Sequence, residues 1–306
     1  MELSTYYYTA YGLSIGSEIA LSQLKEIQPT AVDLVIKRGR IPQSPPLEPT
    51  KVYRSGLNAQ FAQAGLGCLW LDWSPLLSFM AINGNELILD TDQTDEDLLS
   101  LFTLSEAIGL ILFQKGYFLL HGSAIQLTNK GVVFLGQPGA GKSTTVAAFA
   151  QKGVPVLSDD MVCIRLQEGK TPMLIPAFSQ IKIWENTVNG LNLNRTDLTP
   201  VREGLTKFSW HESVSFAQEE VPLAQIFVLE SPSESENTLK PISKSQLPIE
   251  LLNHFPLPDS LLTGNSLKDY FEKSILIANT TPLYKMSRPS DFVKLHQFVE
   301  YIKSTL

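Results

Sequence analysis

The sequence has 306 residues, 43% of them hydrophobic and 18% charged, a balance that predicts a soluble globular protein with a sizeable core. Its net charge of −7, with no cluster of lysine and arginine, argues against nucleic acid or an anionic membrane as the main partner. Two cysteines, no recognisable secretion signal and no uninterrupted apolar span together favour the cytoplasm.

Residues 1–92 are predicted to form a small N-terminal region that contains β-strands. Apolar runs at 31–36 and 86–89 have the composition of strands, and a proline-rich connection lies between them. Thr94 then has the features of a helix cap, because three acidic residues follow it in the first turn. The helix that it begins is expected to end near Phe113 and to open a second domain, residues 93–306.

Short apolar strands separated by tight turns follow from residue 117. They are expected at 117–120, 124–127, 132–135, 154–157, 161–166 and 224–229. A polar excursion at 231–245 comes next, and the chain ends in an amphipathic helix for which Ser290 is the predicted cap. This alternation of strands and helices predicts an α/β fold.

A glycine-rich segment joins the predicted strand 132–135 to a short helix. Residues 136–143 have the sequence Gly-Gln-Pro-Gly-Ala-Gly-Lys-Ser, a pattern whose backbone N–H groups converge on phosphate oxygens in front of a helix dipole. Lys142 would reach the β- and γ-phosphates, and the Ser143 hydroxyl would bind Mg²⁺. The residues expected to bind the nucleotide are Gly136, Pro138, Gly139, Ala140, Gly141, Lys142, Ser143 and Thr144.

Two adjacent acids, Asp159 and Asp160, follow the strand 154–157. Carboxylates at a strand end beside a phosphate loop lie where Mg²⁺ and the γ-phosphate are bound. Because successive side chains on a strand point in opposite directions, we expect one to face the metal and the other the incoming hydroxyl. An aspartate-rich surface turn is the alternative. His121, at the end of the strand 117–120, is by itself better explained as a structural histidine.

Three segments together resemble the catalytic domain of HPr serine kinases and HPr-kinase-like proteins. They are 121–124 (His-Gly-Ser-Ala), 136–143 and 157–160 (Leu-Ser-Asp-Asp), and their order and spacing match from about residue 117 to the end. The resemblance implies an α/β fold with a P-loop kinase core of the HPr kinase and phosphoenolpyruvate carboxykinase type, which would follow the small N-terminal α+β region predicted above. It also implies that Asp159 is the general base, that His121 supports it, and that Asp160 assists Mg²⁺ together with Ser143.

The chain departs from that family in two places. Thr144 stands where HPr kinases carry an acidic residue, and the segment associated there with phosphorolysis and HPr docking is not found. Downstream, Arg202 and Lys207 would either steady the transferring phosphoryl group or be solvated surface charges.

The predicted function is that of an ATP-dependent kinase that uses Mg²⁺ and transfers the γ-phosphoryl group to a hydroxyl. Lys142, Mg²⁺ and the loop amides would act mainly by positioning and charge neutralisation. A serine of a peptide or protein is the first candidate acceptor, and a small-molecule alcohol is the second. An ATP-binding regulator with little turnover also stays open, as does homo-oligomerisation.

Overall fold

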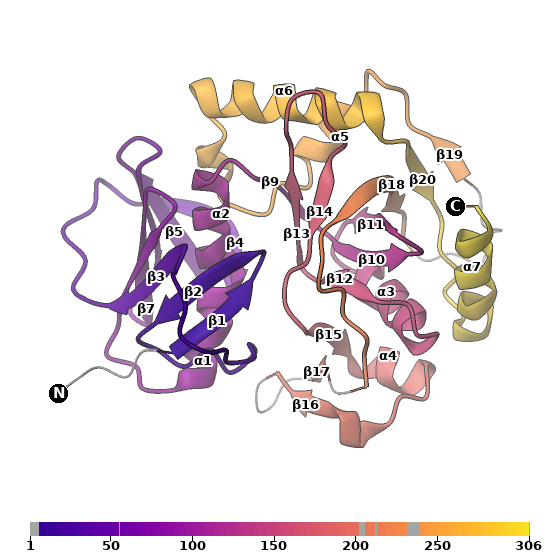
Figure 1. The fold of residues 1–306 in the computed structure, drawn as a ribbon, viewed down its shortest axis with the longest axis horizontal. Coiled ribbons are helices and arrows are strands. Elements are labelled where there is room, and N and C mark those ends of the chain that lie inside the picture. Colours follow the sequence, from indigo (N-terminus) through magenta and orange to yellow (C-terminus); the bar gives the residue numbers. More distant parts are fainter. Residues whose placement is uncertain (1–5, 55, 202–205, 212, 232–238, 306) are drawn as a thin grey trace. The chain divides into compact units, whose positions relative to one another are not determined.

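The computed structural model describes residues 6–54, 56–201, 206–211, 213–231 and 239–305. The chain divides into two compact units, whose elements are labelled in Figure 1. The first unit comprises Met1–Leu119 and Phe255–Tyr270, and the second comprises Leu120–His254 and Phe271–Leu306. The main boundary therefore follows Leu119, and not residue 92 as the sequence suggested.

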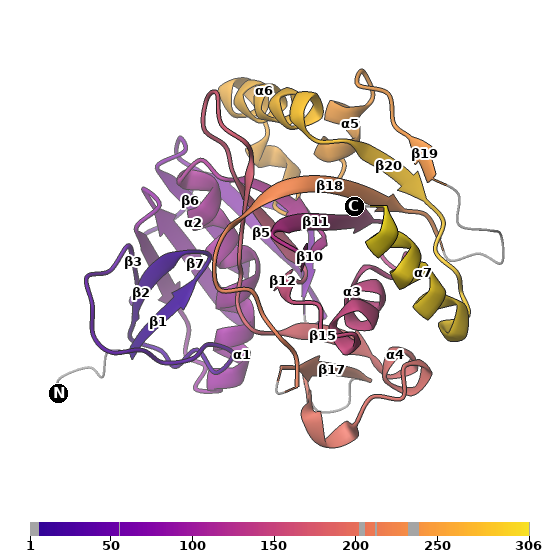
Figure 2. The same cartoon turned by 45° about the vertical axis from the view of Figure 1, so that its right-hand side comes forward.

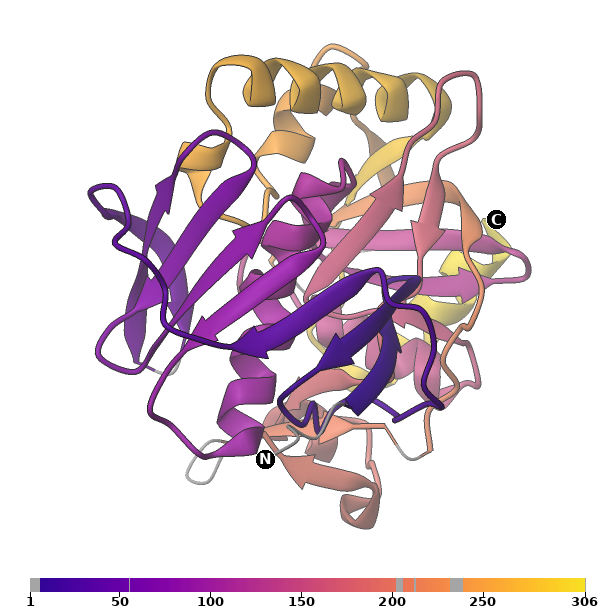
Figure 3. The same cartoon turned by 60° about the vertical axis from the view of Figure 1, so that its left-hand side comes forward.

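An eight-stranded sheet forms most of the first unit, and its strands come forward in Figure 3. The strands are β1 (Tyr6–Ala10), β2 (Leu13–Ser17), β3 (Leu34–Arg38), β4 (Glu48–Arg54), β5 (Leu57–Gln63), β6 (Cys68–Trp73), β7 (Leu77–Ile82) and β8 (Glu86–Asp90). They lie in the order β1-β2-β3-β8-β7-β6-β5-β4, with parallel pairing where β3 meets β2 and β8. The predicted strands at 31–36 and 86–89 correspond to β3 and β8.

The helical segment predicted after residue 94 packs with this sheet, which is why the boundary lies further along the chain. Phe102 and Trp73 are both fully buried, with their rings edge to face and 5.0 Å apart. The cap is Asp95, one residue later than predicted, and its carboxylate accepts the Leu98 N–H at 3.0 Å. The segment is also not continuous, because Ser105 has non-helical angles. Its parts are α1 (Glu96–Phe102), a π-helical turn (Thr103–Ala107) and α2 (Ile108–Gln114).

A nine-stranded mixed sheet is the centre of the second unit. Its strands are β9 (Phe118–His121), β10 (Ser123–Leu127), β11 (Lys130–Gly136), β12 (Val156–Ser158), β13 (Met161–Arg165), β14 (Met173–Ile175), β18 (Val221–Leu229), β19 (Leu239–Pro241) and β20 (Leu283–Met286). The path is β12-β10-β11-β18-β14-β13-β9, and β20 pairs with β18 and β19. The structure thus has the mixed α/β character that the sequence predicted.

The direction of these strands brings several of their ends to one edge. Strands β11, β18 and β20 are parallel and run side by side in Figure 2. Strand β10 is antiparallel to both β11 and β12, so β12 runs in the same direction as β11. The carboxyl ends of β11, β12, β18 and β20 and the amino end of β10 therefore lie along the same edge. In open α/β sheets this is the edge at which ligands bind.

Helices cover this sheet through one apolar cluster. The second unit also contains a small sheet of β15 (Ile181–Trp184), β17 (Lys207–Trp210) and β16 (Leu198–Pro200). Its helices are α3 (Lys142–Gln151), α4 (Glu185–Gly190), α5 (Leu247–Leu252) and α7 (Phe292–Ser304), and α6 (Gly264–Thr280) begins in the first unit and continues into the second. Phe149 of α3 and Phe298 of α7 belong to the same buried cluster as Phe134 and Phe227 of the sheet. Packing of α3 therefore fixes the helix that follows the glycine-rich segment.

The C-terminal helix forms as predicted, with a different cap. Leu295, Phe298, Val299 and Ile302 are buried on one face. The Asp291 carboxylate accepts the N–H groups of Val293 at 2.6 Å and Lys294 at 3.0 Å, so the cap lies one residue beyond Ser290. Within the described part of the chain, no helix has the length and apolar character needed to cross a membrane.

Candidate functional site

The glycine-rich loop connects β11 to α3 at the edge where the strand ends meet. Gly139 and Gly141 have φ values of 86° and 91°, in the left-handed region that glycine adopts without steric cost. Gly141 is the N-cap of α3 and supplies no side-chain cap. The first turn of this ten-residue helix therefore presents its N–H groups and the positive end of its dipole to the loop. Both favour an anion.

Lys142 folds back over this loop. Its ammonium donates to the Gly136 carbonyl at 2.8 Å, and the side chain is buried. Burial lowers the pKa of Lys142, and the charges of Asp160 and Asp159 oppose that effect. The ammonium thus lies within the loop, where phosphate oxygens would replace its carbonyl partner.

Asp159 is tied to the loop by its carboxylate. Its Oδ1 atom accepts hydrogen bonds from Ser143 Oγ at 2.9 Å and Ser123 Oγ at 2.6 Å, and its Oδ2 accepts the Lys182 backbone N–H at 2.9 Å. Burial raises the pKa of Asp159, and the neighbouring charge of Asp160 raises it further, against the hydrogen bonds from Ser123 and Lys182. Three donors on α3, β10 and β15 therefore orient one carboxylate beside the last residue of the loop.

Asp160 faces a different partner. Its Oδ2 atom lies 3.3 Å from the Lys182 ammonium, and its side chain is 35% exposed. Its φ of 70° is unusual for a residue other than glycine, and such strained positions are frequent at functional sites. Together with Asp159 and Lys182 it lines a small recess that Ala177, Phe178 and Gln180 complete. Both acids thus line the recess, and Asp159 also contacts the loop through Ser143.

Three of the remaining predicted residues lie on β9, α3 and β17. The backbone N–H of His121, at the end of β9, donates to the His254 carbonyl at 2.6 Å. Thr144 Oγ1 lies 2.8 Å from Thr187 Oγ1, which links the start of α3 to α4. Lys207 lies on β17, and its charge opposes the rise in the pKa of Asp159 and adds to the lowering of the pKa of Lys142. Arg202 lies outside the described residues.

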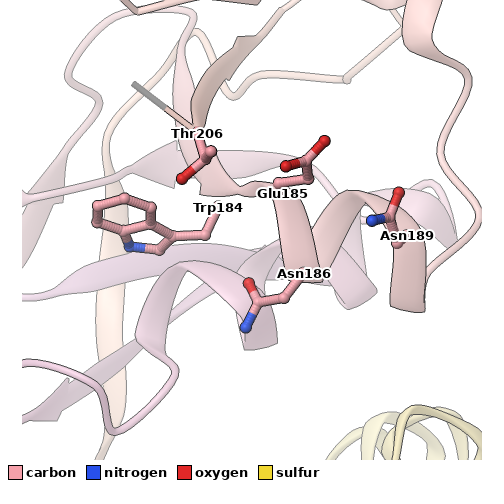
Figure 4. Close-up of a pocket in the computed structure, with 5 residues that line it drawn as sticks. All are labelled: Trp184, Glu185, Asn186, Asn189 and Thr206. Atoms are coloured by element: carbon pink, nitrogen blue, oxygen red, sulfur yellow. The ribbon is translucent and has the colours of Figure 1, made fainter. Parts of the chain in front are cut away.

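A second recess lies where β15 meets α4. It has a volume of about 420 Å³ and is shown in Figure 4. Its lining residues are Trp184, Glu185, Asn186, Asn189 and Thr206. The Trp184 ring is half exposed, and the Lys207 ammonium lies 5.5 Å from its centre. Strand β15 thus carries Lys182 at the acidic pair and Trp184 at this recess.

Three residues of the site escaped the sequence analysis. Ser123 lay within a quoted motif but received no role, and Lys182 had only the weak signal of a lone cation in the apolar run Ile-Lys-Ile-Trp. Arg288, two residues beyond β20, had no signal. Its side chain is buried, and its guanidinium lies against Gly141, where an added Cβ would be 2.4 Å from Arg288 Nε. These are contacts between distant segments.

The side chains present suit a metal that is held partly by a nucleotide. In the described part of the chain, no three His, Cys, Asp or Glu side chains group together as a metal site. Mg²⁺ needs only one or two carboxylates when phosphate oxygens and water complete its shell. Ser143 and the strand-end acids offer that number of oxygen ligands, so they fit such an ion.

Comparison with known proteins gives little further guidance. No family model matches the chain, and no curated protein matches it. One solved structure to which it is similar is the HPr(Ser) kinase/phosphatase from Coxiella burnetii, at 13% identity and a TM-score of 0.33. That similarity covers 61% of this chain and 91% of the other. It is too distant to support a function, so we rely on the geometry of the site.

Proposed function

We propose that this protein is an ATP-dependent phosphotransferase that moves the γ-phosphoryl group to a hydroxyl, with a serine of a peptide or protein as the first candidate acceptor. The contact between Ser143 Oγ and Asp159 Oδ1, at 2.9 Å, carries this proposal. It joins the end of the glycine-rich loop to a partly buried carboxylate just after β12, which is two strands from β11 in the sheet. A turn that merely connected β11 to α3 would not need a desolvated acid beside it.

Each part of the loop has a task in binding the triphosphate. The free N–H groups at the start of α3 would donate to phosphate oxygens. The Lys142 ammonium would leave the Gly136 carbonyl and neutralise the β- and γ-phosphates. When bound, Mg²⁺ would neutralise charge that develops on the transferring group. Such positioning and charge stabilisation supply most of the catalysis in phosphoryl transfer.

The contacts favour different roles for the two acids from those that the family resemblance implies. We assign Asp159 to the metal side, because the Ser143 hydroxyl is its partner and P-loop enzymes hold Mg²⁺ between such a serine and a strand-end aspartate. We assign Asp160 to the acceptor hydroxyl, because its side chain is 35% exposed at the recess and the Asp159 carboxylate is already held by Ser143. Its carboxylate would accept the proton, which leaves late in a loose transition state. The Lys182 ammonium would hold it in place.

Transfer of labelled phosphate from ATP tests this proposal. We would supply a pool of serine-containing peptides, a set of polyols, and water as the acceptor of last resort. Transfer should be lost in Lys142→Ala. In Asp159→Asn the Mg²⁺ concentration for half-maximal rate should rise, whereas in Asp160→Asn the maximal rate should fall with the Mg²⁺ requirement unchanged. The exposed Asp97→Asn on α1 is a matched control that should leave both quantities as they are.

One outcome would contradict the roles assigned to the two acids, and two would contradict the proposed activity or its acceptor. If the Mg²⁺ requirement moves with Asp160 and the maximal rate moves with Asp159 alone, the two roles are reversed. If ATP binds but no acceptor is phosphorylated, the protein is a nucleotide-binding regulator. If only polyols accept phosphate, it is a small-molecule kinase.

A further inference from the structure

Arg288 is a buried cation, and two of its guanidinium nitrogens are unpaired among the described residues. Its side chain is 6% exposed, and among the described residues neither Nε nor Nη1 has a hydrogen-bond partner. Burial lowers the pKa of this guanidinium. A desolvated charge without a partner destabilises the folded protein, so such groups are retained where a ligand provides the partner. The partner required here is an anion.

The guanidinium points to where that anion would bind. A Cβ added to Gly141 would lie 2.4 Å from Arg288 Nε and 2.8 Å from its Cζ and Nη2 atoms. The guanidinium thus contacts the residue at which the glycine-rich loop passes into α3. A helix N-terminus without a side-chain cap and a buried, unpaired cation therefore meet at one point. Both attract negative charge.

Topology assigns Arg288 to one side of the loop. Strand β20, which precedes it, lies beyond β18 in the sheet, whereas β12, which precedes Asp159, lies beyond β10 on the opposite side of β11. The Ser287 hydroxyl donates to Glu230 Oε2 at 2.9 Å, so the segments after β20 and β18 are held together. Arg288 and the carboxylates thus approach the loop from opposite directions. The transferring end of the nucleotide would face the carboxylates.

We propose that Arg288 binds the phosphates that stay with the nucleotide, the α- and β-phosphates. This inference rests on the proposed function, because it requires a nucleotide in the glycine-rich loop. The planar guanidinium can donate two parallel hydrogen bonds to phosphate oxygens. Its contact is the same for ATP and ADP. Arg288 therefore sets affinity for the diphosphate part and does not distinguish substrate from product.

Equilibrium binding by calorimetry tests this inference. The ligands are ATP, ADP and inorganic pyrophosphate, and the proteins are wild type, Arg288→Gln and Arg288→Lys, with the exposed Lys294→Gln of α7 as a control for loss of a nearby charge. Arg288→Gln should weaken all three ligands by the same factor, about tenfold to hundredfold, the usual loss for a hydrogen bond to a charged group. Arg288→Lys should lie between, because lysine keeps the charge but loses the fork. Lys294→Gln should bind like wild type.

The stability of the ligand-free protein separates a ligand-binding role of Arg288 from a structural one. If Arg288 serves the ligand, the unfolding temperature without ligand should be unchanged or higher in Arg288→Gln, because an unpaired buried charge is removed. If the wild type binds ATP and ADP and both variants bind them within twofold of wild type, Arg288 does not contact phosphate. Weakening of the nucleotides without weakening of pyrophosphate also refutes the inference, because Arg288 would then contact the nucleoside.

These experiments distinguish a failure of the Arg288 inference from a failure of the proposed function. If Arg288→Gln does not fold, Arg288→Lys decides, and wild-type affinity in it overturns the inference. Nucleotide binding that depends on Arg288, without transfer to any acceptor, supports this inference and refutes the kinase. A wild type that binds none of the three ligands refutes both.

Discussion

Replacement of Gly141 by alanine tests whether the Arg288 guanidinium occupies the position that the structure gives it. Two costs are expected without any ligand. An alanine at φ 91° is in the left-handed region, which costs about 1–2 kcal/mol. Its Cβ would also lie 2.4 Å from Arg288 Nε, and displacement of a packed side chain costs about 1–3 kcal/mol more. Gly141→Ala should therefore lower the free energy of unfolding by about 2–5 kcal/mol.

The same loop offers a matched control. Gly139 has a φ of 86°, but a Cβ added there meets no atom within 4 Å. Gly139→Ala should therefore show the backbone cost alone, about 1–2 kcal/mol. In an Arg288→Ala background the cost of Gly141→Ala should fall to the same level, because the atoms that it meets are gone. The coupling energy between Gly141 and Arg288 is the quantity of interest.

Labelling of a buried cysteine measures the stability of the second unit, which contains the glycine-rich loop. Cys163 is fully buried on β13 in the second unit, whereas Cys68 is partly exposed in the first. In a Cys68→Ser background, the rate at which a thiol reagent labels Cys163 as urea increases measures the opening of the unit that contains the loop. Equal costs for Gly139→Ala and Gly141→Ala, or an unchanged cost in the Arg288→Ala background, would show that the guanidinium does not lie against Gly141.

Two further predictions concern pH. Burial and the charge of Asp160 raise the pKa of Asp159 in the folded protein above its value in the unfolded chain. The free energy of unfolding should therefore fall as pH rises from the unfolded pKa to the folded pKa. Asp159→Asn should lack this fall, and urea unfolding should show it to be more stable than wild type at pH 7. Burial also raises the pKa of Glu106, but Arg54, which binds it through two contacts of 2.8 and 2.9 Å, outweighs this and lowers it. The ion pair of Arg54 and Glu106 therefore stabilises the fold above the unfolded pKa of Glu106, and this stabilisation is lost as pH falls through the folded pKa. Because the pair is half-buried, Arg54→Met should lower the free energy of unfolding by about 2 kcal/mol at pH 7 and should reduce its dependence on pH in the acid range. No change in either pH profile would contradict these causes.

Features that depend on neighbouring residues could be predicted from the sequence. The glycine pattern and its flanking strand and helix gave the loop between β11 and α3, and the 3.6-residue period gave the buried face of α7. Asp159 and Asp160 do have different contacts, but they lie in the bend between β12 and β13, where Asp160 has a φ of 70°, so the alternation of side chains along a strand is not the reason. Caps were misplaced by one residue, because Thr94 and Asp95, like Ser290 and Asp291, have the same local signal.

Contacts between distant segments were decided by the tertiary structure alone. Trp73 and Phe102 place α1 with the first unit, and no local pattern specifies which aromatic ring meets which. Asp159 receives its donors from β10, α3 and β15, and these elements come together because α3 packs against both β10 and β15. Arg288 follows Gly141 by more than a hundred residues and contacts it because β20 pairs with β18 and β18 with β11. A sequence specifies such a pair only through the whole sheet, because hydrogen bonding and packing between strands depend on register rather than on neighbours in the chain.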